Sequence, residues 1–124
     1  MNNESPYIAG YKNLNVWNKG HDLVLEIYRA TKVFPRDELF GLISQMRRCA
    51  VSIVANIVEG YGRRTTKDKL QFYYISRGSL NELEYYIDLS TELGYMSSDK
   101  GLKLREARAV VGKLLSGFVN AHNR

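Results

Sequence analysis

A row of polar side chains lies along the segment from residue 45 to residue 63. Its members, at three- and four-residue intervals, are Gln45, Cys49, Ser52, Asn56, Glu59 and Arg63. This spacing places side chains on one face of an α-helix. A later segment has Ser79 and Glu82 among apolar residues. Because a carboxylate held among apolar groups can act as a general base, one hypothesis is an active site built on Glu59 or Glu82.

A buried hydrogen-bond network between two helices explains the same residues without catalysis. Polar groups inside a core must find partners, because leaving them unpaired costs about 1–3 kcal/mol each. The row also has no nucleophile next to an obvious activating base. We therefore favour a structural polar seam and predict no catalytic residue and no enzyme activity. The predicted seam consists of Gln45, Arg48, Ser52, Asn56, Glu59, Ser79 and Glu82.

The two polar segments are expected to pack as an antiparallel hairpin. If the chain turns near residue 65, residues whose numbers sum to about 130 lie side by side. This rule pairs Ser52 with Gly78 or Ser79. It also predicts a contact between Arg48 and Glu82.

Residues that bind metals or act as nucleophiles are sparse. Neither histidine, His21 or His122, has another metal ligand at a suitable spacing in its own segment, so we predict no metal and no other cofactor. His21 lies in an apolar stripe and is expected in the core. The single Cys49 cannot form an internal disulfide, which fits a reducing compartment. The glycines of EGYGRR form no phosphate-binding loop, because the required Lys-Ser/Thr pair is missing.

Four segments with helical periodicity follow one another, over about residues 14–33, 39–62, 66–93 and 99–120. Thr65 with Asp68 is typical of a helix start, and Gly94 of a helix end. Short connections make neighbouring helices antiparallel, so the predicted fold is all-α, an antiparallel up-down-up-down four-helix bundle. We expect one domain over residues 13–124, preceded by a loosely ordered lead-in over residues 1–12.

The apolar faces predict which side chains are buried. In the third segment these are Phe72, Ile75, Leu83, Tyr86, Ile87 and Leu89, whereas Tyr73, Tyr74 and Tyr85 are expected to point outward. The first segment has two apolar stripes, and Val51 and Val58 widen the apolar arc of the second. This is more apolar surface than one small bundle can cover, so we expect copies of the chain to associate.

The net charge of +5 is unevenly distributed. Residues 39–69 carry six basic and two acidic side chains, residues 70–96 one and four, and residues 97–124 six and two. The basic excess favours polyanionic partners. No apolar run reaches the roughly 18 to 20 residues of a membrane span, and the first residues do not resemble a secretory leader. We therefore expect a cytoplasmic protein without a membrane partner.

Two basic clusters are candidate nucleic-acid contacts. The first borders the turn between the second and third segments and consists of Arg63, Arg64, Lys67 and Lys69. The second lies in the fourth segment and consists of Lys100, Lys103, Arg105 and Arg108. A basic loop can follow a phosphate backbone and gain salt-dependent affinity without reading sequence. A charged turn that is merely solvated fits the first cluster equally well.

The stretch from Phe34 to Arg63, FPRDELFGLISQMRRCAVSIVANIVEGYGR, followed by GSLNELE over residues 78–84, resembles the bacterial 23S rRNA intervening-sequence proteins. Val54 stands where that family often has proline, and Val58 where alanine is common. The resemblance implies a left-handed four-helix bundle that assembles as a ring, usually a homopentamer. It also implies kinship with the accessory variability determinant protein of diversity-generating retroelements, a basic pentamer that acts with nucleic acid and a reverse transcriptase.

Together these observations predict a cytoplasmic, non-enzymatic, homo-oligomeric bundle, pentameric by resemblance. Its predicted activity is binding of RNA or DNA with weak sequence specificity, as an accessory factor. The main alternative is a scaffold that docks a dedicated protein partner, such as a reverse transcriptase by kinship, and does not bind nucleic acid. An enzyme that uses Asn56, Glu59 and Arg63 is a less favoured third possibility.

Overall fold

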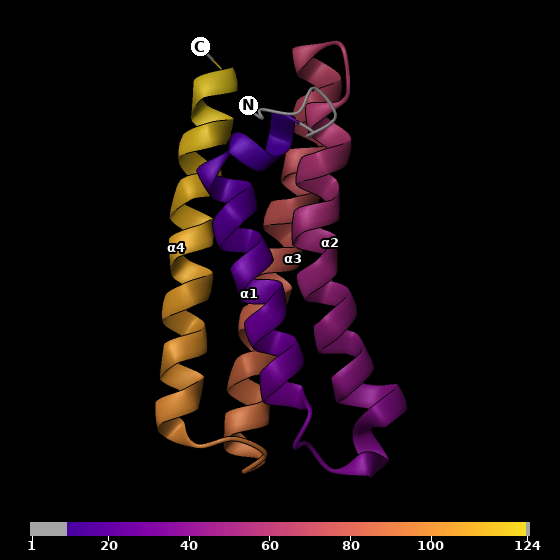
Figure 1. The fold of residues 1–124 in the computed structure, drawn as a ribbon, viewed down its shortest axis with the longest axis vertical. Coiled ribbons are helices and arrows are strands. Elements are labelled where there is room, and N and C mark those ends of the chain that lie inside the picture. The colour runs from indigo at the N-terminus through magenta and orange to yellow at the C-terminus, as the bar shows by residue number, and fades with distance from the viewer. Residues whose placement is uncertain (1–9, 124) are drawn as a thin grey trace, which may run out of the picture.

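A computed structural model describes residues 10–123 of the chain, and four long helices dominate it (Figure 1). They are α1 (Asn15–Thr31), α2 (Ser44–Tyr61), α3 (Thr66–Glu92) and α4 (Ser98–His122). Both α1 and α3 pack against α2 and α4. The predicted all-α, up-down four-helix bundle is confirmed. The α2–α3 turn lies at the same end of the bundle as the start of α1 and the end of α4, and the other two connections lie at the opposite end (Figure 1).

Except at the start of α2, the helix boundaries agree with the predicted segments to within two residues. The Thr65 hydroxyl accepts a hydrogen bond from the Asp68 backbone N–H at 3.1 Å and caps the start of α3. Gly94 has a φ of 79° just after α3, a conformation that glycine adopts at little cost. Of the predicted lead-in, residues 1–9 lie outside the described part of the chain. Residues 10–12 belong to the 3-10 helix η1 (Gly10–Asn13).

The connection from α1 to α2 departs from the continuous helix expected over residues 39–62. It contains the 3-10 helix η2 (Arg36–Glu38) and the short segment η3 (Leu39–Ile43), where the chain is kinked because Gly41 has non-helical angles. The Glu38 carboxylate accepts hydrogen bonds from the Leu42 N–H at 3.1 Å and the Tyr95 hydroxyl at 2.8 Å. Both bonds lower the pKa of Glu38, and the bond from the Leu42 N–H has the larger effect. A Cβ at Gly41 would lie 2.7 Å from Glu38 Oε1, so any other residue there would displace this carboxylate oxygen.

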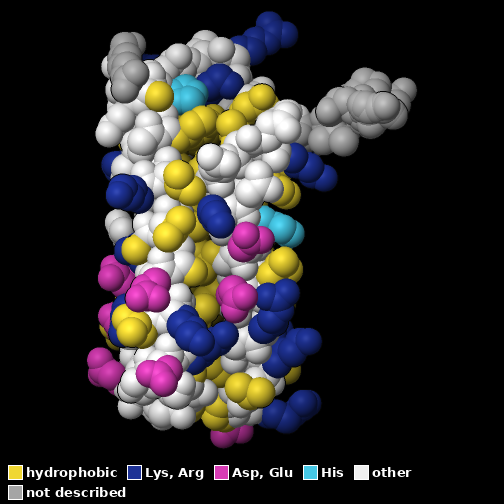
Figure 2. Space-filling view, turned by 60° about the vertical axis from the view of Figure 1, so that its left-hand side comes forward, with side chains coloured by type: hydrophobic (Ala, Val, Ile, Leu, Met, Phe, Trp, Pro, Cys, Tyr) yellow, Lys and Arg dark blue, Asp and Glu magenta, His cyan; other side chains and the backbone are white. Residues whose placement is uncertain are grey.

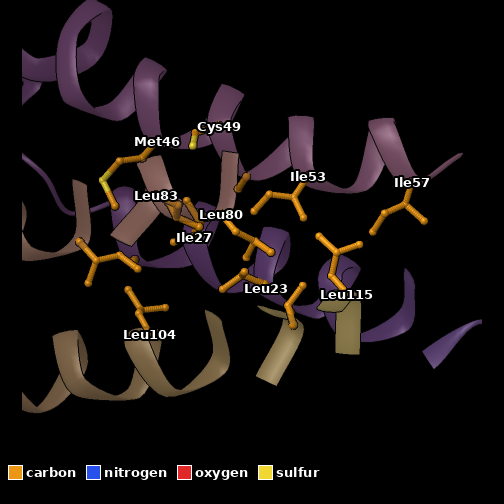
Figure 3. Close-up of a cluster of buried hydrophobic side chains, with 14 of the residues drawn as sticks. Leu23, Ile27, Met46, Cys49, Ile53, Ile57, Leu80, Leu83, Leu104 and Leu115 are labelled. Carbon is orange, nitrogen blue, oxygen red and sulfur yellow. The ribbon is translucent and has the colours of Figure 1, made fainter. Parts of the chain in front are cut away.

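Aliphatic side chains from all four helices meet along the bundle axis (Figure 3). The largest fully buried ones include Leu23, Ile27, Met46, Ile53, Ile57, Leu80, Leu83, Ile87, Leu104 and Leu115. Burial of these side chains is the main force that holds the four helices together.

The buried face of α3 differs from the predicted one. Ile75, expected in the core, is 52% exposed, whereas Tyr73, expected outside, is fully buried. Leu83 and Ile87 are buried as predicted. The prediction for Ile75 and Tyr73 was therefore wrong, and the true face is rotated toward Tyr73.

Buried serines explain this rotation. Ser76 and Ser90 occupy inward positions of α3 and are fully buried. The Ser76 hydroxyl donates to the Ile53 carbonyl of α2 at 2.7 Å, and that of Ser90 donates to the Tyr86 carbonyl at 2.8 Å. Because both hydroxyls are satisfied, serine is tolerated in the core, although it makes this face look polar in the sequence.

His21 was also placed wrongly, because it is exposed instead of buried. Its ring stacks on Trp17, with the ring centroids 5.1 Å apart and the planes 6° apart. The other apolar stripe of α1, which includes Leu23 and Ile27, faces the core. Gly20 lets α1 approach α2 closely, since a Cβ there would lie 3.1 Å from Val54 Cγ2.

Two isoleucines of α3 provide a matched test of the observed face. We expect Ile87→Ala to lower the free energy of unfolding by about 2–5 kcal/mol, because it leaves a cavity in the core. Ile75→Ala should change it by about 0.5 kcal/mol at most, because that side chain is half exposed. Urea denaturation of the two variants measures both values. Equal losses would contradict the orientation of α3 described above.

Candidate functional site

The middle of the polar seam is a closed hydrogen-bond network between α2 and α3. The Ser52 and Ser79 hydroxyls lie 2.9 Å apart, as the predicted hairpin register requires. The Asn56 amide donates to the Ser52 carbonyl at 2.8 Å and to the Ser52 hydroxyl at 3.0 Å. The Cys49 thiol donates to the Ser79 carbonyl at 3.0 Å. These side chains satisfy one another and fix the register of the two helices.

The predicted contact between Arg48 and Glu82 is not formed. Within residues 10–123, no ion pair or hydrogen bond joins these two side chains. Glu82 accepts a hydrogen bond from the Tyr86 hydroxyl at 3.1 Å and a weak one from the Cys49 thiol at 3.7 Å. Cys49 faces α3, and successive residues of a helix point about 100° apart, so Arg48 is directed to the surface.

The outer members of the predicted seam lie at the surface. Gln45 is exposed at the start of α2. Glu59 is exposed near the end of α2 and forms an ion pair with Arg63 at 3.0 Å. The structure therefore does not bring Glu59 and Glu82 together.

The seam contains no activated nucleophile. The pKa of the Cys49 thiol is raised to about 12, mainly by burial and secondly by the nearby Glu82 carboxylate. Cys49 is therefore protonated near neutral pH, whereas a reactive cysteine needs the thiolate. Burial, followed by the hydrogen bond to Glu82, also raises the pKa of Tyr86. No group of three or more His, Cys, Asp or Glu side chains that could hold a metal ion occurs in residues 10–123.

The first basic cluster surrounds the α2–α3 turn. The Arg63 guanidinium lies 4.5 Å from the centre of the Phe72 ring. The Lys69 ammonium donates to the Tyr61 carbonyl at 2.7 Å and so caps the end of α2. Arg64 and Lys67 are exposed, and no acidic side chain of the described chain forms an ion pair with either. The four predicted residues thus lie within or beside one turn, and Arg64 and Lys67 have no acidic partner among the described residues.

The second basic cluster is mostly occupied by contacts within the chain. Lys100 pairs with Glu26 of α1 at 3.4 Å, and Arg105 pairs with Asp88 of α3 at 3.0 Å. The Arg108 guanidinium lies 3.8 Å from the Glu84 carboxylate and donates to the Leu80 carbonyl at 3.2 Å. Lys103 is exposed. Figure 2 shows basic and acidic side chains mixed on the α4 side of the bundle, so this cluster is a weaker candidate for binding a polyanion.

Aromatic rings beside the first cluster escaped the sequence analysis. The Tyr11 ring lies 5.5 Å from that of Trp17 and 6.5 Å from that of Tyr61. The Lys12 ammonium lies 6.0 Å from the Trp17 ring, and that of Lys69 lies 5.5 Å from the Tyr61 ring. The rings come from η1, α1 and α2, so no local pattern in the sequence indicated that they meet.

Part of the apolar surface predicted for α1 and α2 stays accessible to solvent on these two neighbouring helices. We call it the α1–α2 face and define it by Trp17, Val24, Val51, Val54 and Val58. Val51 is 41% exposed and the other four are half-buried. The two helices touch beneath it, as the close approach of Gly20 and Val54 indicates.

Within residues 10–123, no helix is both long and apolar enough to cross a membrane.

Comparison with known proteins identifies similar sequences and folds. The family model described as 23S rRNA-intervening sequence protein matches residues 12–117. The chain superposes, with a TM-score of 0.78, on the crystal structure of a protein with unknown function of the S23 ribosomal protein family from Bacteroides thetaiotaomicron. The two sequences are 23% identical, and the match covers 85% of this chain and 95% of the other. No curated protein matches the sequence.

The raised pKa of Cys49 leads to a pH-dependent stability. The unfolded thiol titrates near pH 8.5, well below its folded pKa of about 12, so the folded state holds its proton more tightly. We expect the free energy of unfolding, measured in urea, to fall as the pH rises from 8 to 10. This decrease should be smaller in Cys49→Ala, which has no thiol to titrate. Identical pH profiles would contradict the buried, protonated thiol.

Proposed function

The chain belongs to the 23S rRNA-intervening sequence protein family, and we propose that it is a non-enzymatic, homo-oligomeric protein that binds RNA or DNA with weak sequence specificity. We place it in the cytoplasm, as an accessory factor. The observation that carries the proposal is the α2–α3 turn, where Arg64 and Lys67 are exposed without acidic partners beside Arg63 and Lys69.

The chemistry of this turn suits a phosphate backbone. Each phosphate neutralised by Arg or Lys releases counterions, so closely spaced cations give affinity that depends on salt. The pair between Arg63 and Glu59 does not prevent this, because an exposed pair of this kind contributes about 0–1 kcal/mol. Such contacts position a nucleic acid but do not distinguish its bases, which is the reason for proposing weak specificity.

Association of copies through the α1–α2 face is the second part of the proposal. Its members are mainly valines, which lose little side-chain freedom on burial and pack well. A cyclic assembly would repeat the α2–α3 turn around one axis and concentrate the positive charge of each chain. The sequence resemblance supports five copies.

A protein scaffold remains the alternative function. The α1–α2 face could bind another protein, such as a reverse transcriptase by kinship, in place of a second copy. The two functions differ in their response to nucleic acid, which the first of the following experiments measures.

Neutralising the α2–α3 turn should weaken nucleic-acid binding. We expect the double variant Arg64→Gln/Lys67→Gln to bind labelled RNA and DNA more weakly and to lower the salt slope by about 1 for each lost phosphate contact. Fluorescence anisotropy at two or more salt concentrations measures both effects. Arg105→Gln is the control, because that guanidinium is already paired with Asp88 and should matter less. Absence of wild-type binding even at low salt would overturn nucleic-acid binding and favour the scaffold.

A charge in the α1–α2 face should dissociate the assembly. We expect Val51→Glu to reduce the molar mass measured by light scattering, because burying an unpaired carboxylate in an interface is costly. Val51 is already 41% exposed within one chain, so the helical circular dichroism should be retained. Val110→Glu, a change at a valine of α4 that is 47% exposed, is the matched control and should keep the wild-type mass. A monomeric wild type would contradict self-association.

A further inference from the structure

The connection from α1 to α2 lies at the end of the bundle opposite the α2–α3 turn (Figure 1). Residues of this connection and of the adjoining turns of α1 and α2 line two adjoining hollows. Their volumes are about 160 and 330 Å³, and both are lined by Leu39, Ile43 and Arg47. We call them together the corner groove. The other residues that line it are Tyr28, Thr31, Lys32, Phe34, Arg36, Phe40, Ser44 and Arg48.

The corner groove is strongly basic. Four of its lining residues are Lys or Arg, and none is Asp or Glu. The nearby Glu38 is turned toward the Leu42 N–H and the Tyr95 hydroxyl. A concave surface with charge of one sign attracts a ligand of the opposite sign, so the groove suits a polyanion.

Phe40 is the most exposed large hydrophobic residue of the described chain, at 92%. It lies in η3, at the kink where Gly41 has non-helical angles and the Glu38 carboxylate accepts a hydrogen bond from the Leu42 N–H. The fold therefore holds an aromatic ring in solvent at the edge of a basic groove.

A second ring lines the same hollow. Tyr28 is 39% exposed, and the Arg47 guanidinium lies 4.7 Å from its centre. Arg47 is held there by a hydrogen bond to the Thr31 hydroxyl at 2.9 Å. The hollow thus combines two exposed rings, Tyr28 and Phe40, with the cations of Arg47 and Arg48.

We propose that the corner groove binds single-stranded nucleic acid, with a base stacked on Phe40 and phosphates on Arg47 and Arg48. Single strands expose the faces of their bases, whereas a duplex hides them between neighbouring pairs. Aromatic rings beside a basic groove therefore distinguish the two forms. This inference rests on the proposed function and adds a class of substrate and a second contact surface to it.

Substitution of the exposed ring tests this inference. The probes are a labelled single-stranded RNA and a blunt RNA duplex of the same length, titrated by fluorescence anisotropy at low salt. We expect the wild type to prefer the single strand. Phe40→Ala should weaken single-strand binding about 5- to 150-fold, the range for losing one stacked base, and leave duplex binding nearly unchanged. Because Phe40 is 92% exposed, the variant should fold normally, which circular dichroism checks.

Tyr85→Ala is the matched control, because Tyr85 is a 62% exposed aromatic residue on α3, outside the groove. It should bind both probes as the wild type does. Photo-crosslinking with 5-bromouridine RNA should label a peptide that contains Phe40.

The outcomes separate this inference from the proposed function. If the wild type binds RNA but shows no strand preference, and Phe40→Ala binds equally well, the corner groove is not the site and the proposed function stands. If the wild type binds neither probe at low salt, both are overturned. Tighter binding of polyglutamate than of the single strand, lost in Phe40→Ala, would assign the groove to an acidic protein and overturn the inference.

Discussion

The close packing of α2 against α3 is the contact on which the rest of the structure depends. The two helices approach through small residues, and at Gly60 there is no room for a side chain, because a Cβ would lie 2.5 Å from the Tyr73 ring. Buried hydroxyls then fix the register, with Ser76 bonded to the Ile53 carbonyl and Ser79 to Ser52. A shift along either helix would leave these polar groups unpaired inside the core, which is far more costly than the bonds are stabilising.

This packing also decides where chemistry is possible. The polar groups between α2 and α3 use their hydrogen bonds on one another, and the one thiol among them, Cys49, keeps its proton. Along α4, ion pairs to α1 and α3 neutralise most of the positive charge. Two groups of basic side chains without an acidic partner among the described residues, Arg64 with Lys67 and Arg47 with Arg48, lie at opposite ends of α2. This arrangement suits a protein that binds a charged polymer at its surface better than an enzyme with an interior site.

The two ends present their positive charge differently. At the α2–α3 turn the neighbouring rings contact one another or a lysine, so the turn offers charge more than free aromatic surface. At the opposite end the ring of Phe40 is 92% exposed and lines the same hollow as Arg47 and Arg48. The apolar α1–α2 face lies between them. Copies that associate through this face would bring several such ends close together. Several weak contacts to one nucleic acid would then add up to a higher overall affinity.

The sequence by itself determined the four helices and their boundaries except the kinked start of α2, because periodicity and capping are local properties of a chain. It also predicted the pairing of Ser52 with Ser79 between α2 and α3, but not the partners of Arg48 and Glu82. The sequence did not determine which of the two apolar stripes of α1 faces the core, since either stripe could be buried. It also did not indicate the buried face of α3, because that face contains serines whose hydroxyls are hydrogen-bonded inside the core. The sequence shows where the basic residues lie along the chain, but it does not show which acidic side chains pair with them. Whether Arg105 is paired and Arg64 is not depends on side chains far away in the sequence, and only the packed bundle brings those together.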